Sequence, residues 1–218
     1  KAECDHEYKT MKLKELFESA GTSVADLGIE YTDGDLLLYP AELRLYGDKT
    51  FTRLTSLKGS PNHITGDFYC NDNEIDTLIG GPIIVDGDFI CNRNNLTTLD
   101  GSPEKVGASF FCPTNHLMSL KGITKNIGQS LNCSNNLIAS LKGVHEHVTS
   151  VGSVFLATEN PIKSHVLGLL LIKDLKKIRL DNKQVEEILN RHLGKGRAGM
   201  LMAQEELIEA ELEEFAQL

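Results

Sequence analysis

An internal repeat with a period of 21 residues constrains the fold of this chain more than any other feature of its sequence. Four cysteines follow one another at this spacing, and they are Cys70, Cys91, Cys112 and Cys133. Four asparagines keep the same spacing three residues further on, and they are Asn73, Asn94, Asn115 and Asn136. Self-similarity at a fixed period of this size is typical of solenoids, in which each repeat forms one turn of a stack and contacts only its neighbours. The chain is therefore predicted to form a solenoid.

The repeating unit reads L-x-G-x-P-x-x-[VI]-x-x-x-[FL]-x-C-x-x-N-x-[LI], as in Leu78–Leu96. In the segment F-x-C, alternate residues of an extended chain point to the same side. Phe68 and Cys70 are therefore expected to enter the core while Tyr69 faces outward, and stacked units are expected to form a parallel sheet. A further copy follows with three extra residues, and its Ala157 occupies the cysteine position.

An asparagine at a fixed place in each repeat is best explained by a buried amide. Its oxygen and nitrogen satisfy backbone groups where the chain turns off the strand, which an apolar side chain could not do. One such amide in each turn gives an asparagine ladder along the stack. The Gly and Pro positions of the unit then provide unusual dihedral angles and prevent strand pairing on the return path.

With Phe or Leu, then Cys, then Asn at successive positions, the repeat resembles the leucine-rich-repeat family, whose core pattern is L-x-x-L-x-L-x-x-N/C-x-L. The resemblance covers roughly residues 45–163. It implies an α/β repeat fold, with a parallel β-sheet on the concave face of a horseshoe and with helical N- and C-terminal caps. The expected division is an N-terminal cap at 1–46, a solenoid of about five to six repeats at 47–163, and a helical C-terminal cap at 164–218.

The repeated cysteines admit three interpretations. A zinc site needs ligands that converge on one point, whereas these follow an axis, about 5 Å apart between neighbouring strands. A disulfide framework suits small secreted proteins, but the total of five cysteines is odd and no secretory signal is evident. Burial as free thiols, which behave as small hydrophobic side chains, fits the repeat best. On this interpretation we expect a reducing, cytoplasmic environment.

Composition and charge narrow the class of partner. The formal net charge is −9 at pH 7 and the pI is about 5.3, so phosphate backbones would mostly be repelled and nucleic acid is not expected as a partner. The long apolar run Val166–Ile172 is too short to cross a bilayer, so no membrane partner is expected. The seven histidines are scattered, and neither catalysis, a cofactor nor a metal is expected. His145-Glu146-His147 is interpreted as a solvated turn rather than a weak metal site.

Segments outside the repeat are expected to cover the ends of the stack, whose terminal turns would otherwise expose apolar flanks. At the N-terminal side, Met11–Ala20 is predicted to be a short amphipathic helix. Leu36–Leu38 and Leu43–Leu45 are candidate strands leading into the first repeat.

On the C-terminal side, Val166–Ile172 is predicted to be a buried helix and Lys177–Leu180 a strand. Asp181, with Gln184 three residues later, resembles a capping box that starts the next helix, which should stop near Gly194. The Gly-rich segment from residue 194 to 199 is interpreted as a linker. The last helix is predicted to gather four apolar residues on one side, opposite most of its glutamates, and they are Leu201, Ile208, Leu212 and Phe215.

Candidate binding residues come from the outward positions of the predicted sheet. The residue between Phe or Leu and Cys in successive copies is, in chain order, Tyr69, Ile90, Phe111, Asn132 and Leu156. Charged residues beside this row complete the first candidate site, and they are Asp67, Asp88 and Arg93. Exposed apolar stripes of this type often mark interaction sites. The alternative is that the termini of the chain cover the sheet. A second, weaker candidate site on the last helix consists of Glu205, Glu209, Leu212 and Phe215.

These features favour a non-enzymatic protein-binding module. The tightly repeated Cys and Asn positions and the acidic C-terminal stretch resemble those of leucine-rich-repeat proteins of tailed bacteriophages. This resemblance implies that the partner is a host protein in the host cytoplasm, and that the role could take the form of inhibiting host defence. The alternative is a structural or assembly component, a homo-oligomer that self-associates through the solenoid edge or through the C-terminal helix.

Overall fold

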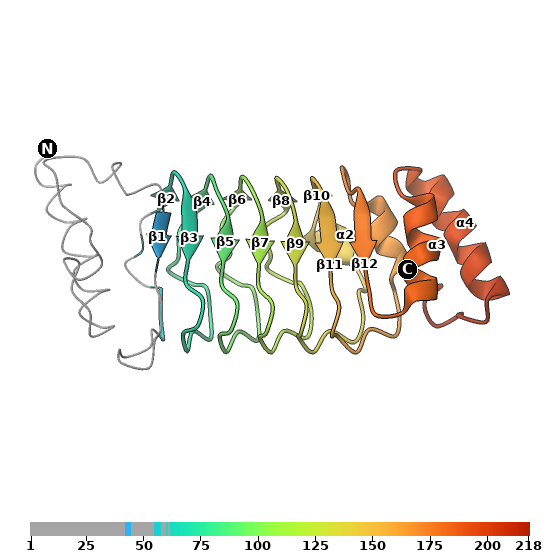
Figure 1. Cartoon of the computed structure of the whole chain (residues 1–218), viewed down its shortest axis with the longest axis horizontal. Coiled ribbons are helices and arrows are strands. Elements are labelled where there is room, and N and C mark those ends of the chain that lie inside the picture. Colours follow the sequence, from blue (N-terminus) through green and yellow to red (C-terminus); the bar gives the residue numbers. More distant parts are fainter. Residues whose placement is uncertain (1–41, 45–54, 58–59, 61) are drawn as a thin grey trace, which may run out of the picture.

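The computed structural model describes residues 42–44, 55–57, 60 and 62–218. Within them the chain is a parallel β-solenoid of about six turns, followed by two helices at the C-terminal end (Figure 1). The predicted helix at Met11–Ala20 and the predicted strand at Leu36–Leu38 lie outside the described residues.

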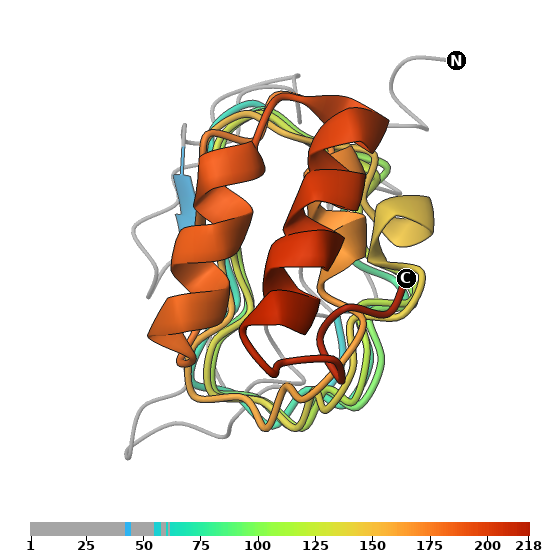
Figure 2. The ribbon, with the colours of Figure 1, turned by 90° about the vertical axis from the view of Figure 1, so that its right-hand side faces the viewer.

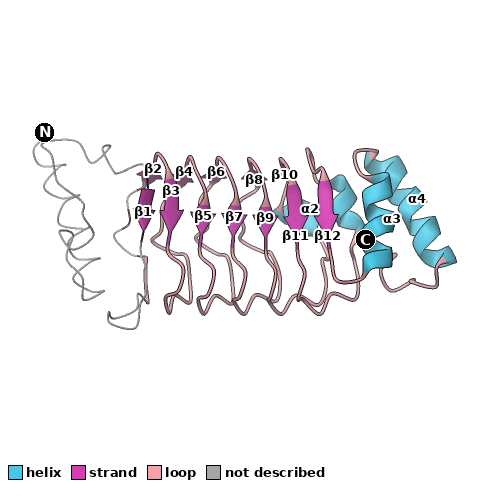
Figure 3. Cartoon of the chain, in the orientation of Figure 1, coloured by secondary structure: helices cyan, strands magenta, loops and turns pink. Residues whose placement is uncertain are grey.

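Five successive turns of the solenoid contribute strands to two sheets, and every strand pair in both sheets is parallel (Figure 3). The seven-stranded sheet contains, in spatial order, β1 (Glu42–Arg44), β3 (Asp67–Tyr69), β5 (Phe89–Ile90), β7 (Phe110–Phe111), β9 (Leu131–Asn132), β11 (Val154–Leu156) and β12 (Lys177–Arg179). The five-stranded sheet contains β2 (His63–Ile64), β4 (Ile84–Val85), β6 (Lys105–Val106), β8 (Asn126–Ile127) and β10 (Ser150–Val151). The repeat pattern predicted the first sheet, whereas the second was not anticipated, although the [VI] position of the unit lies in it.

The core lies between the two sheets and repeats with the sequence. In-register pairing places Phe68 beside Phe89 and Phe89 beside Phe110, and all three rings are fully buried. The ring centroids are 5.6 Å apart in the first pair and 5.0 Å apart in the second. Buried aliphatic side chains of the five-stranded sheet form the opposite wall of the core. Because every turn adds the same layer, one 21-residue pattern specifies the whole stack.

The stack is nearly straight, and the expected horseshoe with a concave sheet is wrong. The turns follow a straight axis when seen from the side (Figure 1), and they superpose when seen along that axis (Figure 2). The physical reason is that both long sides of a turn carry strands, and neighbouring strands are about 4.8 Å apart in any sheet. Curvature would require a wider spacing on one side than on the other.

The four repeat cysteines are buried and free, as the alternation of inward and outward residues predicted. They follow Phe68, Phe89, Phe110 and Leu131 by two residues and lie in the same inward-facing layer of each turn. Burial raises the pKa of all four thiols, and that of Cys133 reaches about 12. The thiolate, which is the reactive form, is therefore scarce at neutral pH.

Thiol labelling tests this arrangement. In the native protein at about pH 8, Cys70, Cys91, Cys112 and Cys133 should react with a thiol reagent orders of magnitude more slowly than in urea, because the reagent must wait for unfolding. Mass spectrometry of proteolytic peptides identifies which cysteines carry the label. Rapid native labelling of any of these four would show that its side chain faces solvent.

The predicted asparagine ladder is present, and it connects successive turns. Asn94 is buried, and its Oδ1 accepts a hydrogen bond of 3.1 Å from the Ile75 N–H of the preceding turn. Its Nδ2 donates to the carbonyl oxygen of Cys70, also in the preceding turn, at 2.9 Å, and to that of Cys91 in its own turn at 3.1 Å. Asn115, Asn136 and Asn160 repeat this pattern. Each amide therefore holds two turns together.

The C-terminal elements agree with the sequence in type and differ in detail. The predicted buried helix is a 3-10 helix, η2 (Leu167–Leu171), and a short helix, α2 (Val144–His147), precedes it. The next helix, α3 (Lys183–His192), is capped by Asn182, whose side chain accepts from the Val185 N–H, and not by Asp181. The predicted linker is wrong in part, because α4 (Gly196–Glu209) already begins at Gly196.

The predicted apolar face of the last helix is also wrong. The buried residues of α4, which packs on η2, are Gly199, Met200, Ala203 and Leu207, while Leu201 and Ile208 are exposed. The helix ends at Glu209, so Leu212 and Phe215 are not part of it and do not share a helical face with Leu201 and Ile208.

The outer edge of β12 would present unpaired backbone groups to other chains if nothing covered it. Asn190 of α3 accepts from the Ile178 N–H at 2.8 Å and donates to the Ile178 carbonyl at 2.9 Å. Glu186, one turn earlier in α3, accepts from the Leu180 N–H at 2.8 Å. Side chains of α3 thus take the place of a further strand, and the sheet is closed at its C-terminal edge.

The Glu186 carboxylate also makes two ion pairs, with Arg179 at 3.0 Å and with Lys183 at 2.9 Å. Burial raises the pKa of Glu186, but the Leu180 N–H and the two cations together lower it by more than burial raises it. The pKa of Glu186 therefore lies below the ordinary value of 4.5. A carboxyl with a lowered folded-state pKa stabilises the fold above its unfolded-state pKa, and this contribution is lost as the pH falls through the folded-state value.

Glu186→Gln is therefore expected to lower the free energy of unfolding by about 2 kcal/mol at neutral pH, because the amide keeps the bond to Leu180 but loses both charge-assisted pairs. As the pH falls from the ordinary value of 4.5 through the lower folded-state pKa, the difference should shrink, because the unfolded wild-type chain gains a proton on Glu186 first and the folded protein gains it last. Urea unfolding of both proteins at neutral and acidic pH measures this. A difference that does not change with pH would contradict the assignment.

Candidate protein-binding face

One row of outward-facing residues runs along the middle of the seven-stranded sheet. In-register pairing joins Tyr69 to Ile90, Ile90 to Phe111, Phe111 to Asn132, Asn132 to Leu156, and Leu156 to Arg179. We call this row the sheet ridge, and it consists of Tyr69, Ile90, Phe111, Asn132, Leu156 and Arg179. The structure thus brings together the five row residues selected from the sequence and adds Arg179, which the 21-residue period could not reach because β12 lies after the repeat ends.

All six residues of the sheet ridge are half-buried. Neighbouring strands are about 4.8 Å apart, so stacked side chains cover one another's flanks and leave only their outer surfaces to solvent. The part formed by Tyr69, Ile90 and Phe111 is apolar and aromatic, while Asn132 and Arg179 make the C-terminal part more polar. Tyr69, Ile90 and Phe111 thus form an apolar strip that is partly exposed to solvent.

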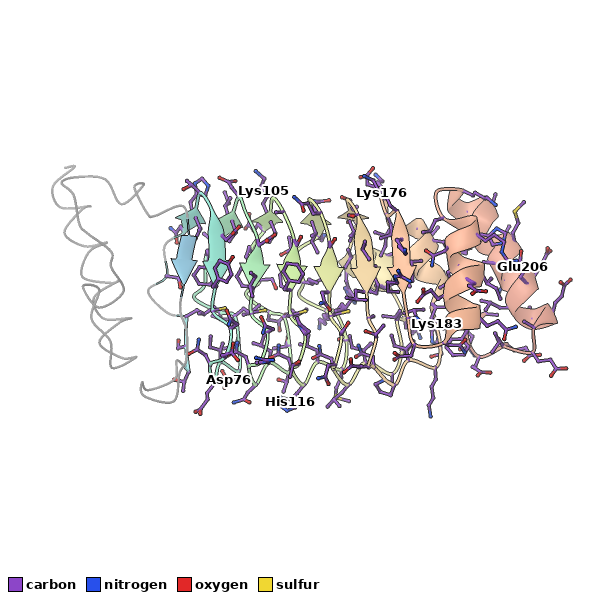
Figure 4. All side chains as sticks on the ribbon, viewed as in Figure 1. Asp76, Lys105, His116, Lys176, Lys183 and Glu206 are labelled. Atoms are coloured by element: carbon purple, nitrogen blue, oxygen red, sulfur yellow. The ribbon has the colours of Figure 1, made fainter. Side chains whose placement is uncertain are left out.

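Exposed polar side chains lie at the two ends of the flattened turns, outside the strands of the seven-stranded sheet. Figure 4 shows Lys105 and Lys176 at the top of the stack, and Asp76 and His116 at its bottom. All four of these side chains are exposed. An apolar strip with polar margins is the usual anatomy of a protein interface.

Asp67 and Asp88, which were predicted to contact a partner, each use one carboxylate oxygen in a hydrogen bond between turns. Asp67 Oδ1 accepts the Asp88 N–H at 2.7 Å, and Asp88 Oδ1 accepts the Ser109 N–H at 2.7 Å. The 21-residue spacing of these positions was the available signal for a second ladder. The other oxygen of Asp67 accepts from the Tyr69 hydroxyl at 3.3 Å and so helps to orient that ring.

Arg93 lies beside the sheet ridge rather than on it. Its backbone is left-handed, with φ 53°, in the turn after β5, and the equivalent residues Asp72 and Thr114 share this conformation. The exposed guanidinium lies 3.4 Å from Asp72 Oδ1, a distance at which a surface ion pair contributes little stability. Arg93 is therefore an exposed charge in the turn that follows β5, next to the sheet ridge.

No described helix lies over the seven-stranded sheet. Seen along the stack (Figure 2), α3 and α4 cover the end of the solenoid, and α2 lies on the side away from this sheet. Among residues 62–218, the termini therefore do not cover the sheet ridge. The part of that alternative that concerns residues 1–41 lies outside the described residues.

The second candidate site, on the last helix, is divided by the structure. Glu205 and Glu209 are exposed on α4, Leu212 is half-buried, and Phe215 is only 6% exposed because it packs into the protein's own core. Phe215 cannot contact a partner without leaving that core, so its prediction as a binding residue is wrong. The large apolar residues exposed on α4 are Leu201, Met202 and Ile208, and none of the three was among the residues predicted for this site.

Among the described residues, no group of three or more His, Cys, Asp or Glu side chains is placed to hold a metal ion. The Ser140 and Ser164 hydroxyls lie 3.0 and 2.8 Å from His165 Nδ1, but no described carboxylate bonds to this imidazole. No described helix is long and apolar enough to span a membrane.

Comparison with known proteins does not assign the chain to a family. No protein-family model matches it, no curated protein is significantly similar to it, and no solved structure matches its fold.

Proposed function

We propose that this chain is a non-enzymatic protein-binding module that presents the sheet ridge to a protein partner. The observation that carries the proposal is the continuous, partly exposed apolar strip on a sheet that no described helix covers. Tyrosine and phenylalanine bury much surface at a low cost in side-chain entropy, and such residues often dominate binding energy. Residues that are already held in paired strands lose little conformational entropy when they bind.

The proposed family, partner and location are supported by the sequence alone. The Leu, Cys and Asn positions of the repeat support a leucine-rich-repeat assignment. The resemblance to proteins of tailed bacteriophages supports a host protein in the host cytoplasm as the partner, with inhibition of host defence as the form of the role. The net charge of −9 argues against nucleic acid as the partner.

Paired variants test the proposal in affinity capture from a bacterial lysate. Tyr69→Ser with Phe111→Ser removes the aromatic part of the sheet ridge. Ile79→Ser with Met118→Ser is the matched control, because both residues are large, apolar and exposed but lie on the return side of the turns. A partner should be retained by the wild type and the control and lost by the ridge variant. Identical partners for all three proteins would overturn the proposal.

Self-association is the second candidate function, and a different observation favours it. The solenoid-edge route meets an obstacle at the C-terminal end, where Asn190 and Glu186 already satisfy the outer edge of β12. The exposed apolar side chains of α4 support the other route, through the C-terminal helix.

A further inference from the structure

The outward side of α4 combines exposed apolar and charged residues in a single stripe. Leu201, Met202 and Ile208 are 53%, 48% and 48% exposed, although large apolar side chains on a helix usually face a core. Residues three or four apart on a helix share a face, so these three lie with exposed Ala198 and Glu205 along one side. We define the α4 outer face as Arg197, Ala198, Leu201, Met202, Glu205, Ile208 and Glu209.

The α4 outer face lies at the C-terminal end of the molecule, beyond the last turn of the solenoid (Figures 1 and 2). The last residues of the chain do not cover it. They fold back toward the core, where Phe215 is buried and the Ala216 carbonyl accepts a bond of 2.9 Å from Gln204 Nε2. The inward side of α4 is occupied by η2 and α3.

Charge is distributed asymmetrically along this stripe. Arg197 lies at its N-terminal end, while Glu205 and Glu209 lie toward its C-terminal end. Within the described part of the chain none of these three makes an ion pair, in contrast to Glu206, which pairs with Arg191 at 2.8 Å. The face is therefore complementary to a copy of itself that runs in the opposite direction.

The geometry of an antiparallel pair can be worked out from the helix rise of about 1.5 Å per residue. A two-fold axis near Ala203 places Arg197 opposite Glu209 of the second copy and about one turn, roughly 6 Å, from its Glu205. The same axis brings Leu201 and Met202 of both copies together at the centre. A parallel pair would instead set glutamates against glutamates. The opposed helix dipoles also favour the antiparallel arrangement.

We propose that two copies of this chain pair through the α4 outer face in an antiparallel, two-fold arrangement that joins two solenoids at their C-terminal ends. Such an interface is isologous, because each copy contributes the same patch. It uses one helix from each copy and is small, so dissociation in the micromolar range is expected. It leaves the sheet ridge free for another partner.

Sedimentation from about 1 to 500 μM measures the pairing, and the wild type should shift from monomer to dimer across this range. Leu201→Glu should weaken the dimer at least about tenfold by placing a charge at the centre of the apolar contact. Met118→Ser, which removes an apolar side chain that is 72% exposed elsewhere, is the control and should dimerise like the wild type. A wild type that stays monomeric throughout, or a dimer that Leu201→Glu leaves unchanged, would overturn the proposal.

Charge reversal tests the antiparallel geometry. Arg197→Glu alone and Glu209→Arg alone should each dimerise poorly, because each creates like charges at both ends of the contact. An equimolar mixture of the two variants should dimerise as well as the wild type, since both ends of the mixed pair then carry opposite charges. Urea midpoints confirm that each variant is folded. Dimerisation of the single variants at the wild-type level, or a mixture no better than its components, would exclude this pairing.

Discussion

Asn94→Leu is expected to lower the free energy of unfolding by about 4 kcal/mol. The leucine has a similar size, but it cannot accept from the Ile75 N–H or donate to the Cys70 and Cys91 carbonyls. Each buried backbone group left without a partner costs about 1 to 3 kcal/mol, and the low dielectric of the core keeps this cost high. Since the amide joins two turns, the damage should extend to the neighbouring turns on both sides.

Asn95→Leu is the matched control for this effect. The same substitution one residue later changes an exposed side chain, so the free energy of unfolding should change by no more than about 0.5 kcal/mol. Urea unfolding followed by circular dichroism gives both midpoints. Equal midpoints for the two variants would mean that the ladder contributes nothing to stability.

Gly101→Ala is expected to be of comparable severity for a steric reason. Gly101 has a φ of +90°, and an added Cβ would lie 2.3 Å from the Ile79 nitrogen and 2.5 Å from the Leu78 carbonyl carbon of the preceding turn. Both atoms are backbone, so they can move away only if the spacing between turns increases. Left-handed strain and overpacking each cost about 1 to 3 kcal/mol, which gives a total of about 4 kcal/mol.

Gly194→Ala separates the two contributions. Gly194, after α3, also has a positive φ, of +75°, but no atom lies within 4 Å of the position of an added Cβ. Its substitution should therefore cost only the conformational term, about 1 kcal/mol. Thermal unfolding of the two variants beside the wild type provides the comparison. If both alanines cost the same, the close approach of the turns at Gly101 has no energetic consequence.

The layers of the stack could be predicted from the sequence alone. In-register stacking gives every copy of a position the same surroundings, so a 21-residue pattern of Phe, Cys and Asn is enough to show which side chains are buried and which amides form the ladder. The same alternation placed Tyr69, Ile90 and Phe111 on the outer side of the sheet. These conclusions depend only on the period of two along a strand and on the period of the repeat.

What each face of the molecule packs against depends on the three-dimensional arrangement of the elements. The sequence did not show that strands lie on both long sides of the turns, and this equal spacing makes the stack straight. It did not show that the Asp67 carboxylate bonds to the next turn, because an aspartate at a strand end is equally consistent with a solvated charge. The sides of α4 were assigned wrongly, since the end of the helix at Glu209 and the packing on η2 decide that Leu207 is buried and Leu201 exposed. A helical pattern with apolar residues on two sides does not specify which side packs, and only the neighbouring elements settle it.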